Sequence, residues 1–331
     1  MTKTNRLSLA SVCCGLLLLT AGCGLLDTDQ PNTIDPGDLD TPEGAEAKRV
    51  GALADFTLAQ DGDGNDAAAA TEGYIMVSGL LSDEFFFSST PPSQQEVDQR
   101  AMIEINPTLF GVYHTLHRAR RAAEDAAASL ENFSVDGPLH PGVAEMLTLA
   151  GFTYVYFAEG FCSGVAYSER VNDEPVFGNP ETTAESLARA IARFDAALAS
   201  PGAAPEEINA AAVGKGRALL DDGQYAAAAA AVSGVPDDFE YLLEHAPSPL
   251  RLRNSIYLLT NGGQWSIADV EGGNGLDFRN GDPRVPFIDE QAPGLDNSTP
   301  QFSLIKFPDV SASVPLASGI EARLIEAEAQ F

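Results

Sequence analysis

Cysteine is scarce in this sequence, with four cysteines in 331 residues. Cys13, Cys14 and Cys23 lie at the N-terminal end, which leaves Cys162 as the one cysteine of the remaining chain. One thiol cannot form an internal disulfide, so the sequence excludes the class of small secreted domains that are held together by disulfide bonds. The protein must be stabilised by its core, and a hydrophobic content of 44% is enough for a sizeable one.

Basic residues are few as well. The chain has 19 lysines and arginines against 48 aspartates and glutamates, which gives a formal net charge of −29. Such a charge repels the phosphates of nucleic acids and the anionic headgroups of membranes. The composition therefore excludes DNA, RNA and a membrane surface held by charge alone as partners, so any attachment to a membrane has to be covalent.

Apolar runs long enough to cross a membrane are missing. The N-terminal run from Leu7 to Leu19 is shorter than the roughly 20 residues that a membrane-spanning helix needs. Lys3 and Arg6 precede this run, and small residues follow it. A basic start, a short apolar run and a small-residue end are typical of a secretory signal, so we predict a signal peptide over residues 1–22.

The signal segment ends at a cysteine whose thiol can be alkylated. Leu19-Thr20-Ala21-Gly22-Cys23 resembles the lipobox of bacterial lipoproteins, which implies cleavage before Cys23 and attachment of lipid, such as palmitate, to it. Several acyl chains on one residue hold a protein on a membrane, whereas a single chain binds only marginally. The alternative is an ordinary signal peptide with a cysteine nearby.

Helical patterns dominate the next two hundred residues or so. Residues 23–41 are acidic and contain two prolines, which predicts an extended tether, and residues 42–245 predict a helical-repeat region. Thr41-Pro42 is a typical helix start, because a capping side chain precedes a proline at the first helical position. Helices are expected at 43–60, 74–81, 107–130, 141–161, 182–198, 206–220 and 225–232.

The composition changes beyond residue 245, where proline, glycine and asparagine become frequent. Residues 246–318 predict a loop-rich, ligand-facing region with long loops and a short hairpin. A helical pattern returns at 319–331 and predicts the start of a further helix, which we interpret as truncated. Residues 216–228 are typical of the junction in a tetratricopeptide-type repeat, although no regular period extends along the chain. We therefore predict a mostly α fold of tetratricopeptide-like helical pairs with a loop-rich, mixed subdomain.

Motifs for catalysis are weak. Residues 160–164 have the letters of a nucleophile elbow around Cys162, but that motif needs a strand before the turn, and a helix is predicted there. His114 and His117 could face one metal ion from a helix, but the arginines of the next turn would repel a cation. We therefore predict no catalytic residue, no enzyme activity and no cofactor.

A calcium loop is a weak candidate for a metal site. Asp61, Asp63, Asn65 and Glu72 match the first, third, fifth and twelfth positions of such a loop. Asp66 stands at the sixth position, where the sharp turn requires glycine. The alternative is a flexible loop between two helices.

Two aromatic groups are candidates for binding sugar. The first is Ser82-Asp83-Glu84-Phe85-Phe86-Phe87, followed by Arg100, and the second is Asn261-Gly262-Gly263-Gln264-Trp265, which holds the only tryptophan. Ring faces cover the C–H bonds of a sugar while polar groups take its hydroxyls. The candidate ligand-binding residues are Asp83, Phe86, Phe87, Arg100, Asn261, Gln264 and Trp265. The alternative for each group is packing, and three consecutive phenylalanines cannot all face one core from a helix.

Six segments follow one another in the order seen in a known family. They are Leu25–Pro31 after the lipobox cysteine, Leu81–Glu84, Glu145–Phe157, Phe161–Pro175, Gly281–Arg284 and Ile320–Ala329. The ordered set resembles the SusD/RagB-type outer-membrane nutrient-binding lipoproteins. Leu81-Ser82-Asp83-Glu84 is similar to that family's "(T/S)DE", Gly281-Asp282-Pro283-Arg284 to its "DPR", and Ile320–Ala329 to its "AEA" helix.

The resemblance implies a function as well as a fold. The protein would be lipid-anchored at Cys23 to the outer membrane of a Gram-negative bacterium and face the exterior. It would act as a lid on a SusC-type TonB-dependent transporter, catch oligosaccharides or peptides, and pass them inward. The alternative is a helical-repeat scaffold lipoprotein that binds only protein partners.

This sequence departs from the family pattern at three points. The chain stops at the "AEA" helix, the turn after Phe161 has an altered core, and only one tryptophan remains for a sugar platform.

Overall fold

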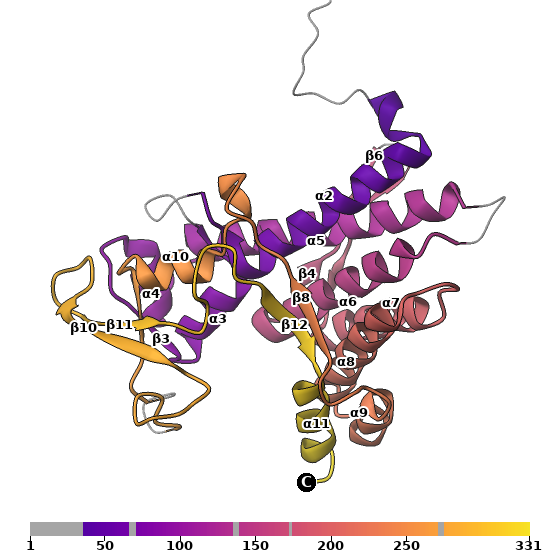
Figure 1. Ribbon diagram of the computed structural model, residues 1–331. Coiled ribbons are helices and arrows are strands. Elements are labelled where there is room, and N and C mark those ends of the chain that lie inside the picture. Colours follow the sequence, from indigo (N-terminus) through magenta and orange to yellow (C-terminus); the bar gives the residue numbers. More distant parts are fainter. Residues whose placement is uncertain (1–35, 66–70, 135–138, 172–173, 271–274) are drawn as a thin grey trace, which may run out of the picture. The chain divides into compact units, whose positions relative to one another are not determined.

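The computed structural model describes residues 36–65, 71–134, 139–171, 174–270 and 275–331 (Figure 1). Residues 41–331 form one unit, and residues 36–40, with the short 3₁₀ helix η1 at Pro36–Leu39, are the described part of the chain before it. The predicted signal peptide, Cys23 and most of the predicted tether therefore lie outside the described residues.

Helices make up most of the described chain, as the sequence predicts. The α-helices are α2 (Pro42–Asp61), α3 (Tyr74–Leu81), α4 (Pro92–Asp98), α5 (Pro107–Asn132), α6 (Gly142–Gly160), α7 (Thr183–Leu198), α8 (Pro205–Asp221), α9 (Tyr225–Val232), α10 (Ser255–Asn261) and α11 (Gly319–Glu328), with a second 3₁₀ helix η2 at Leu250–Leu252. The seven helices expected between 43 and 232 are confirmed to within three residues at each end. None of the helices in the described ranges is both long and apolar enough to span a bilayer.

Local capping explains several of these boundaries. Gly44 N donates to Thr41 Oγ1 at 2.9 Å, with Pro42 at the first position of α2, as the sequence predicts. Thr182 and Glu185 form a reciprocal capping box at the start of α7. Asn106 caps α5 with a single hydrogen bond, in which its side chain accepts from Leu109 N at 3.1 Å.

The long helices stack in chain order. Helix α5 packs on α2 and α6, and α6, α7 and α8 each pack on the next helix (Figure 1). Small residues let the backbones approach. A Cβ added at Gly151 of α6 would lie 2.6 Å from the Phe194 ring of α7, and one at Gly214 of α8 would lie 2.4 Å from it. Phe194 thus fills a space that two glycines leave open, which joins three successive helices.

Strands are short, and in the described part of the chain each strand pairs with one other. The strands are β1 (Gly62–Asp63), β2 (Thr71–Glu72), β3 (Phe85–Phe87), β4 (Val165–Ala166), β5 (Glu169–Val171), β6 (Glu174–Val176), β7 (Pro180–Glu181), β8 (Glu240–Leu243), β9 (Trp265–Ile267), β10 (Phe287–Pro293), β11 (Pro300–Leu304) and β12 (Val314–Ser318). The antiparallel pairs are β1–β2, β3–β9, β4–β7, β5–β6, β8–β12 and β10–β11.

The loop-rich region packs against the N-terminal helices as well as on itself. Strand β9 pairs with β3 and contacts β11, and α10 packs on β9 and β11. Helices α3 and α4 pack on β3 (Figure 1). The β10–β11 pair is the short hairpin that the sequence predicts, but helix α10 was not expected there. Strand β12 pairs with β8, and α11 then packs on α8 and α9. One cluster of buried side chains therefore runs from the helical stack into residues 246–318.

Candidate ligand pocket at strands β3 and β9

Three consecutive phenylalanines leave helix α3 and continue as a strand. Phe85, Phe86 and Phe87 pair with Ile267, Ser266 and Trp265 in that order. Because side chains alternate along a strand, Phe85 and Phe87 share one face, and both are buried, whereas Phe86 is only partly buried. Three consecutive phenylalanines cannot all face one core from a helix. In a strand they point to alternate faces, so the three rings need not share one core.

A pocket of about 330 Å³ opens beside this strand pair. It is lined by Glu84, Phe85, Ile267, Leu276, Phe278, Arg284, Val285, Leu304 and Lys306. Phe85, Ile267, Phe278 and Leu304 each expose 8% or less of their surface, so they form a fixed apolar wall. This volume is at the lower end of the range of about 300–1,000 Å³ that small-molecule sites occupy.

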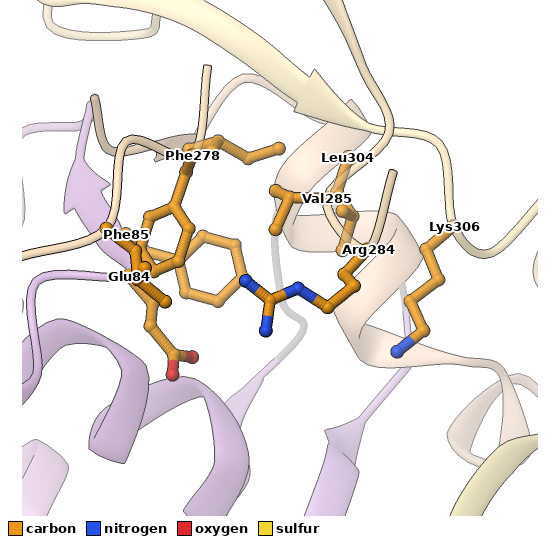
Figure 2. Close-up of a pocket in the computed structure, with 9 residues that line it drawn as sticks. Glu84, Phe85, Phe278, Arg284, Val285, Leu304 and Lys306 are labelled. Atoms are coloured by element: carbon orange, nitrogen blue, oxygen red, sulfur yellow. The ribbon is translucent and has the colours of Figure 1, made fainter. Parts of the chain in front are cut away.

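Charged groups lie on one side of the apolar wall. Figure 2 shows the ends of Glu84, Arg284 and Lys306 on the same side of the Phe85 and Phe278 rings, with the Arg284 guanidinium reaching across the pocket. A wall of rings and aliphatic groups with a few charged donors and an acceptor beside it suits a ligand that has an apolar face and polar edges.

A turn holds Arg284 in place. Gly281 has φ of 84°, a conformation that glycine adopts without strain. Asp282 Oδ1 accepts from the backbone N of Arg284 at 2.9 Å and from its Nε at 3.0 Å. Hydrogen bonds from Arg284 lower the pKa of Asp282 to about 2, so this carboxylate stays ionised and keeps the guanidinium oriented at neutral pH.

Comparison with solved structures identifies the fold. The chain is similar to a SusD superfamily protein from Bacteroides thetaiotaomicron, with a TM-score of 0.62 and 14% identity over 87% of this chain and 76% of that one. A SusD-like carbohydrate binding protein from Bacteroides vulgatus gives a TM-score of 0.60 and 14% identity over 88% and 71% of the two chains. A SusD superfamily protein from Bacteroides fragilis gives 0.60 and 13% over 87% and 75%. The fold is SusD-like.

At this level of identity the likeness concerns the fold, and it confirms the mostly α, SusD-like architecture that the sequence predicts. No family model matches the chain, and no curated protein matches it significantly. The three chains are longer than this one, which covers between 71% and 76% of them.

The tryptophan of this SusD-like chain does not face a ligand, so the prediction that Trp265 stacks on sugar is wrong. The side chain is completely buried. Its ring meets the rings of Phe85 and Phe87 edge to face, with centroids 6.1 and 5.8 Å away. Phe87 is buried in the same cluster, so it is also not a platform for sugar. Both were expected at a surface because sequence alone does not tell which side of a short strand is covered.

Two other predicted ligand residues contact each other. Arg100 Nη2 lies 2.7 Å from Asp83 Oδ2, and it also donates to Leu81 O at 2.7 Å. Asp83 and Arg100 have φ of 59° and 53°, the left-handed region that few side chains adopt. The pair joins the residues that follow α3 and α4, and neither residue lines the pocket at β3 and β9.

The second predicted group lies at the end of α10. Asn261 Nδ2 donates to Tyr257 O at 3.2 Å and to Leu304 O at 3.1 Å, which attaches this helix end to β11. The backbone carbonyl of Gln264 accepts from Ser88 N at 2.9 Å. Neither Asn261, Gln264 nor Phe86 lines the pocket, so their ligand role stays a prediction.

The prediction of a calcium loop is wrong at its first ligand, Asp61. Asp61 Oδ2 lies 3.0 Å from His245 Nε2, and Asp61 Oδ1 accepts from Gln60 Nε2 at 3.2 Å, so both oxygens have partners in the core. Glu72 accepts from Gln94 Nε2 at 2.9 Å. Asp63 and Asn65 line a separate open cavity, and residues 66–70 lie outside the described residues. Among the described residues, no three His, Cys, Asp or Glu side chains are placed to hold a metal ion.

Most of the pocket cannot be found from the sequence. Glu84, Phe85 and Arg284 lie in sequence motifs but are not among the predicted ligand residues. The motifs do not include Leu276, Phe278, Val285, Leu304 and Lys306. The aromatic segment 82–87, which contains Glu84 and Phe85, is the predicted sugar-binding group that lies at this pocket.

Proposed function

We propose that this protein is a cell-surface lipoprotein that captures nutrient oligomers, glycans above all, and delivers them to a SusC-type TonB-dependent transporter. The observation that carries this proposal is the SusD-like fold, which the chain shares with a SusD-like carbohydrate binding protein from Bacteroides vulgatus. The ordered motifs and the lipobox segment support it from the sequence. Residues 1–22 would be the signal peptide, 23–41 the tether, and 246–318 the ligand-facing region.

Capture needs no covalent step. The pocket at β3 and β9 offers ring faces and aliphatic groups to the C–H face of a sugar, and Arg284, Lys306 and Glu84 would hydrogen-bond its hydroxyls. Cys162 is exposed and follows helix α6 rather than a strand, so the elbow geometry of a nucleophilic cysteine is missing there. The activity that we propose is binding and transfer of a ligand.

The double variant Arg284→Gln and Lys306→Gln tests the pocket. It is expected to weaken binding of the preferred neutral oligosaccharide about tenfold or more, because both charged donors are lost. The measurement is calorimetric titration against maltoheptaose, cellohexaose, xylohexaose and mannohexaose. Lys215→Gln is the matched control, since Lys215 forms an ion pair with Asp195 on the helical stack at 2.6 Å and lies outside the pocket. Unchanged affinity in the double variant would show that the ligand binds outside this pocket. Absence of binding of any of these glycans to the wild-type protein would favour the protein-binding scaffold.

Anchoring is tested at Cys23. Metabolic labelling with a palmitate analogue should mark the wild-type protein, and Cys23→Ser should abolish the label and release the protein from the membrane fraction. Equal labelling of Cys162→Ser, the other cysteine outside the signal peptide, controls for non-specific acylation. A Cys23→Ser protein that stays labelled and membrane-bound contradicts the proposed anchor.

Partnership with a transporter is tested by affinity purification of the full protein from its own outer membrane. A TonB-dependent barrel among the major partners supports delivery to a transporter. Reproducible purification without such a barrel, together with a stable complex with a different protein, would favour the scaffold alternative.

A further inference from the structure

A second cavity, of about 620 Å³, lies between helix α5 and the segment 166–170 together with Pro175. It shares no lining residue with the pocket at β3 and β9. Four arginines line it, Arg118, Arg120 and Arg121 from α5 and Arg170 from β5, together with one carboxylate, Glu169. The whole chain has 19 basic residues and a net charge of −29, so a cavity with four arginines is unusually basic for this protein.

The carboxylate near Arg118 is shared between two arginines. Asp55 Oδ1 lies 3.1 Å from Arg118 Nη2 and 3.7 Å from Arg251 Nη2. A guanidinium has five N–H donors, so one carboxylate cannot satisfy two of them. The Arg118 side chain is 44% exposed, which leaves its remaining donors accessible from the cavity. Arg121 has its own partner, because its Nε donates to Asp125 Oδ2 at 2.9 Å.

The carboxylate near Arg120 is shared in the same way. Glu124 Oε2 lies 2.7 Å from Arg120 Nη1, and Glu124 Oε1 lies 2.9 Å from Arg193 Nη2. Burial alone would raise the pKa of Glu124, but the two guanidinium charges outweigh it and lower the pKa. Arg120 is 2% exposed, and its Nη2 donates to Ser168 O at 2.7 Å. Its Nε is buried and has no hydrogen-bond partner among the described residues. The cavity thus has positive charge and donors in excess.

Aromatic groups stand beside these arginines. Tyr113 and His114 line the cavity one to two turns before Arg118 on α5, and Pro175 lines it from β6. His117 packs on Tyr113 and Phe157, with centroids 4.5 and 4.4 Å apart, and burial and the charge of Arg120 lower its pKa to about 4. His117 is therefore neutral at pH 7, and the positive charge of the site comes from the arginines.

We propose that this cavity is a second ligand site, which binds the carboxylate of a saccharide that contains one or two uronate units. The inference rests on the proposed nutrient-binding function and names a ligand class for it. Arginine pairs with a planar carboxylate through two parallel hydrogen bonds, and Tyr113 and His114 offer ring faces to the attached sugar. The negative charge of the whole chain repels long polyanions. A ligand with one or two charges interacts mainly with groups within the screening length of about 8 Å, and near this cavity those groups include the arginines.

Calorimetric titration of the purified protein with digalacturonate and with its dimethyl ester tests this site. The two probes have the same rings, and the ester replaces each carboxylate with a neutral methyl ester. The wild-type protein is expected to bind digalacturonate at least about tenfold more tightly than the ester, and the double variant Arg118→Gln and Arg121→Gln is expected to remove this difference. Arg323→Gln is the control for loss of an arginine outside the cavity, because Arg323 is a 38% exposed arginine on α11, and it should keep the preference. Thermal melts of all variants check that each is folded.

Three results of these titrations would overturn the proposal, and a competition experiment gives a fourth. They are equal binding of the acid and the ester, a preference that survives in the Arg118 and Arg121 variant, and a loss of preference in Arg323→Gln. Sodium sulfate that competes as well as digalacturonate would also overturn it, because the site would then hold a bare anion rather than a sugar. Failure here is distinct from failure of the proposed function, since neutral glycans are tested at Arg284 and Lys306, which this double variant leaves intact.

Discussion

Replacing Trp265 with alanine is expected to lower the free energy of unfolding by about 3–5 kcal/mol, the usual cost of removing a fully buried large aromatic side chain. The ring has no exposed surface, and its edge-to-face neighbours Phe85 and Phe87 would be left around a cavity. Phe85 also forms part of the pocket wall, so the pocket should lose shape in this variant. Denaturant unfolding monitored by circular dichroism measures the change.

Trp265→Phe is the matched control. Phenylalanine keeps a ring between Phe85 and Phe87, and it removes the indole Nε1, which is buried and has no hydrogen-bond partner among the described residues. The loss of apolar surface is thus partly offset by the loss of an unsatisfied donor, and a cost of about 1 kcal/mol is expected. Affinity for oligosaccharides should not change in this variant. A folded Trp265→Phe protein that has lost ligand binding would show that the indole contacts the ligand after all.

The helices of eight or more residues could be predicted because their signals are local, whereas the seven-residue helices α4 and α10 were not predicted. Thr41 and Pro42 start α2, Thr182 and Glu185 start α7, and apolar side chains repeat at helical spacing between such caps. Each signal is complete within one or two turns of the chain. No distant residue is needed to interpret it.

The strands and the pocket could not be predicted because their partners are distant in sequence. Phe87 pairs with Trp265, and Leu243 pairs with Val314, in strands of three to five residues. A strand this short shows hardly one cycle of alternation, so the sequence does not say which face is buried. For this reason the sequence predicts that the aromatic segment lies near a ligand, but it does not tell which of the rings are exposed and which are buried. Phe85 lines the pocket, and Phe87 and Trp265 support it from within the core.

Asp61 and His245 form a polar contact that links the end of α2 to the residues after β8. Both side chains are buried, with 0% and 1% exposure and 3.0 Å between Asp61 Oδ2 and His245 Nε2. His245 Nδ1 lies 3.1 Å from Leu252 O, a carbonyl that can only accept, so Nδ1 must carry the proton that is donated there. The contact with Asp61 needs a second proton, on the imidazole or on the carboxyl. Burial raises the pKa of Asp61, while His245 acts in the opposite direction.

Asp61→Ala is expected to cost about 3–5 kcal/mol of unfolding free energy, because it leaves the buried imidazole of His245 without its partner. It also removes the acceptor for Gln60 Nε2, whose own Oε1 accepts from Tyr156 OH at 2.5 Å. The whole chain of hydrogen bonds from α6 through α2 to Leu252 is thereby interrupted. Chemical denaturation at pH 7 measures the loss.

Asp61→Asn separates hydrogen bonding from charge. The amide oxygen can still accept from Gln60, and the amide N–H can donate to Nε2 of a neutral His245 whose Nδ1 still donates to Leu252 O. Every buried polar atom of the network then keeps a partner, so a cost of about 1 kcal/mol or less is expected. If asparagine destabilises the protein as much as alanine does, the contact depends on the charge of Asp61 and not on the completed set of hydrogen bonds.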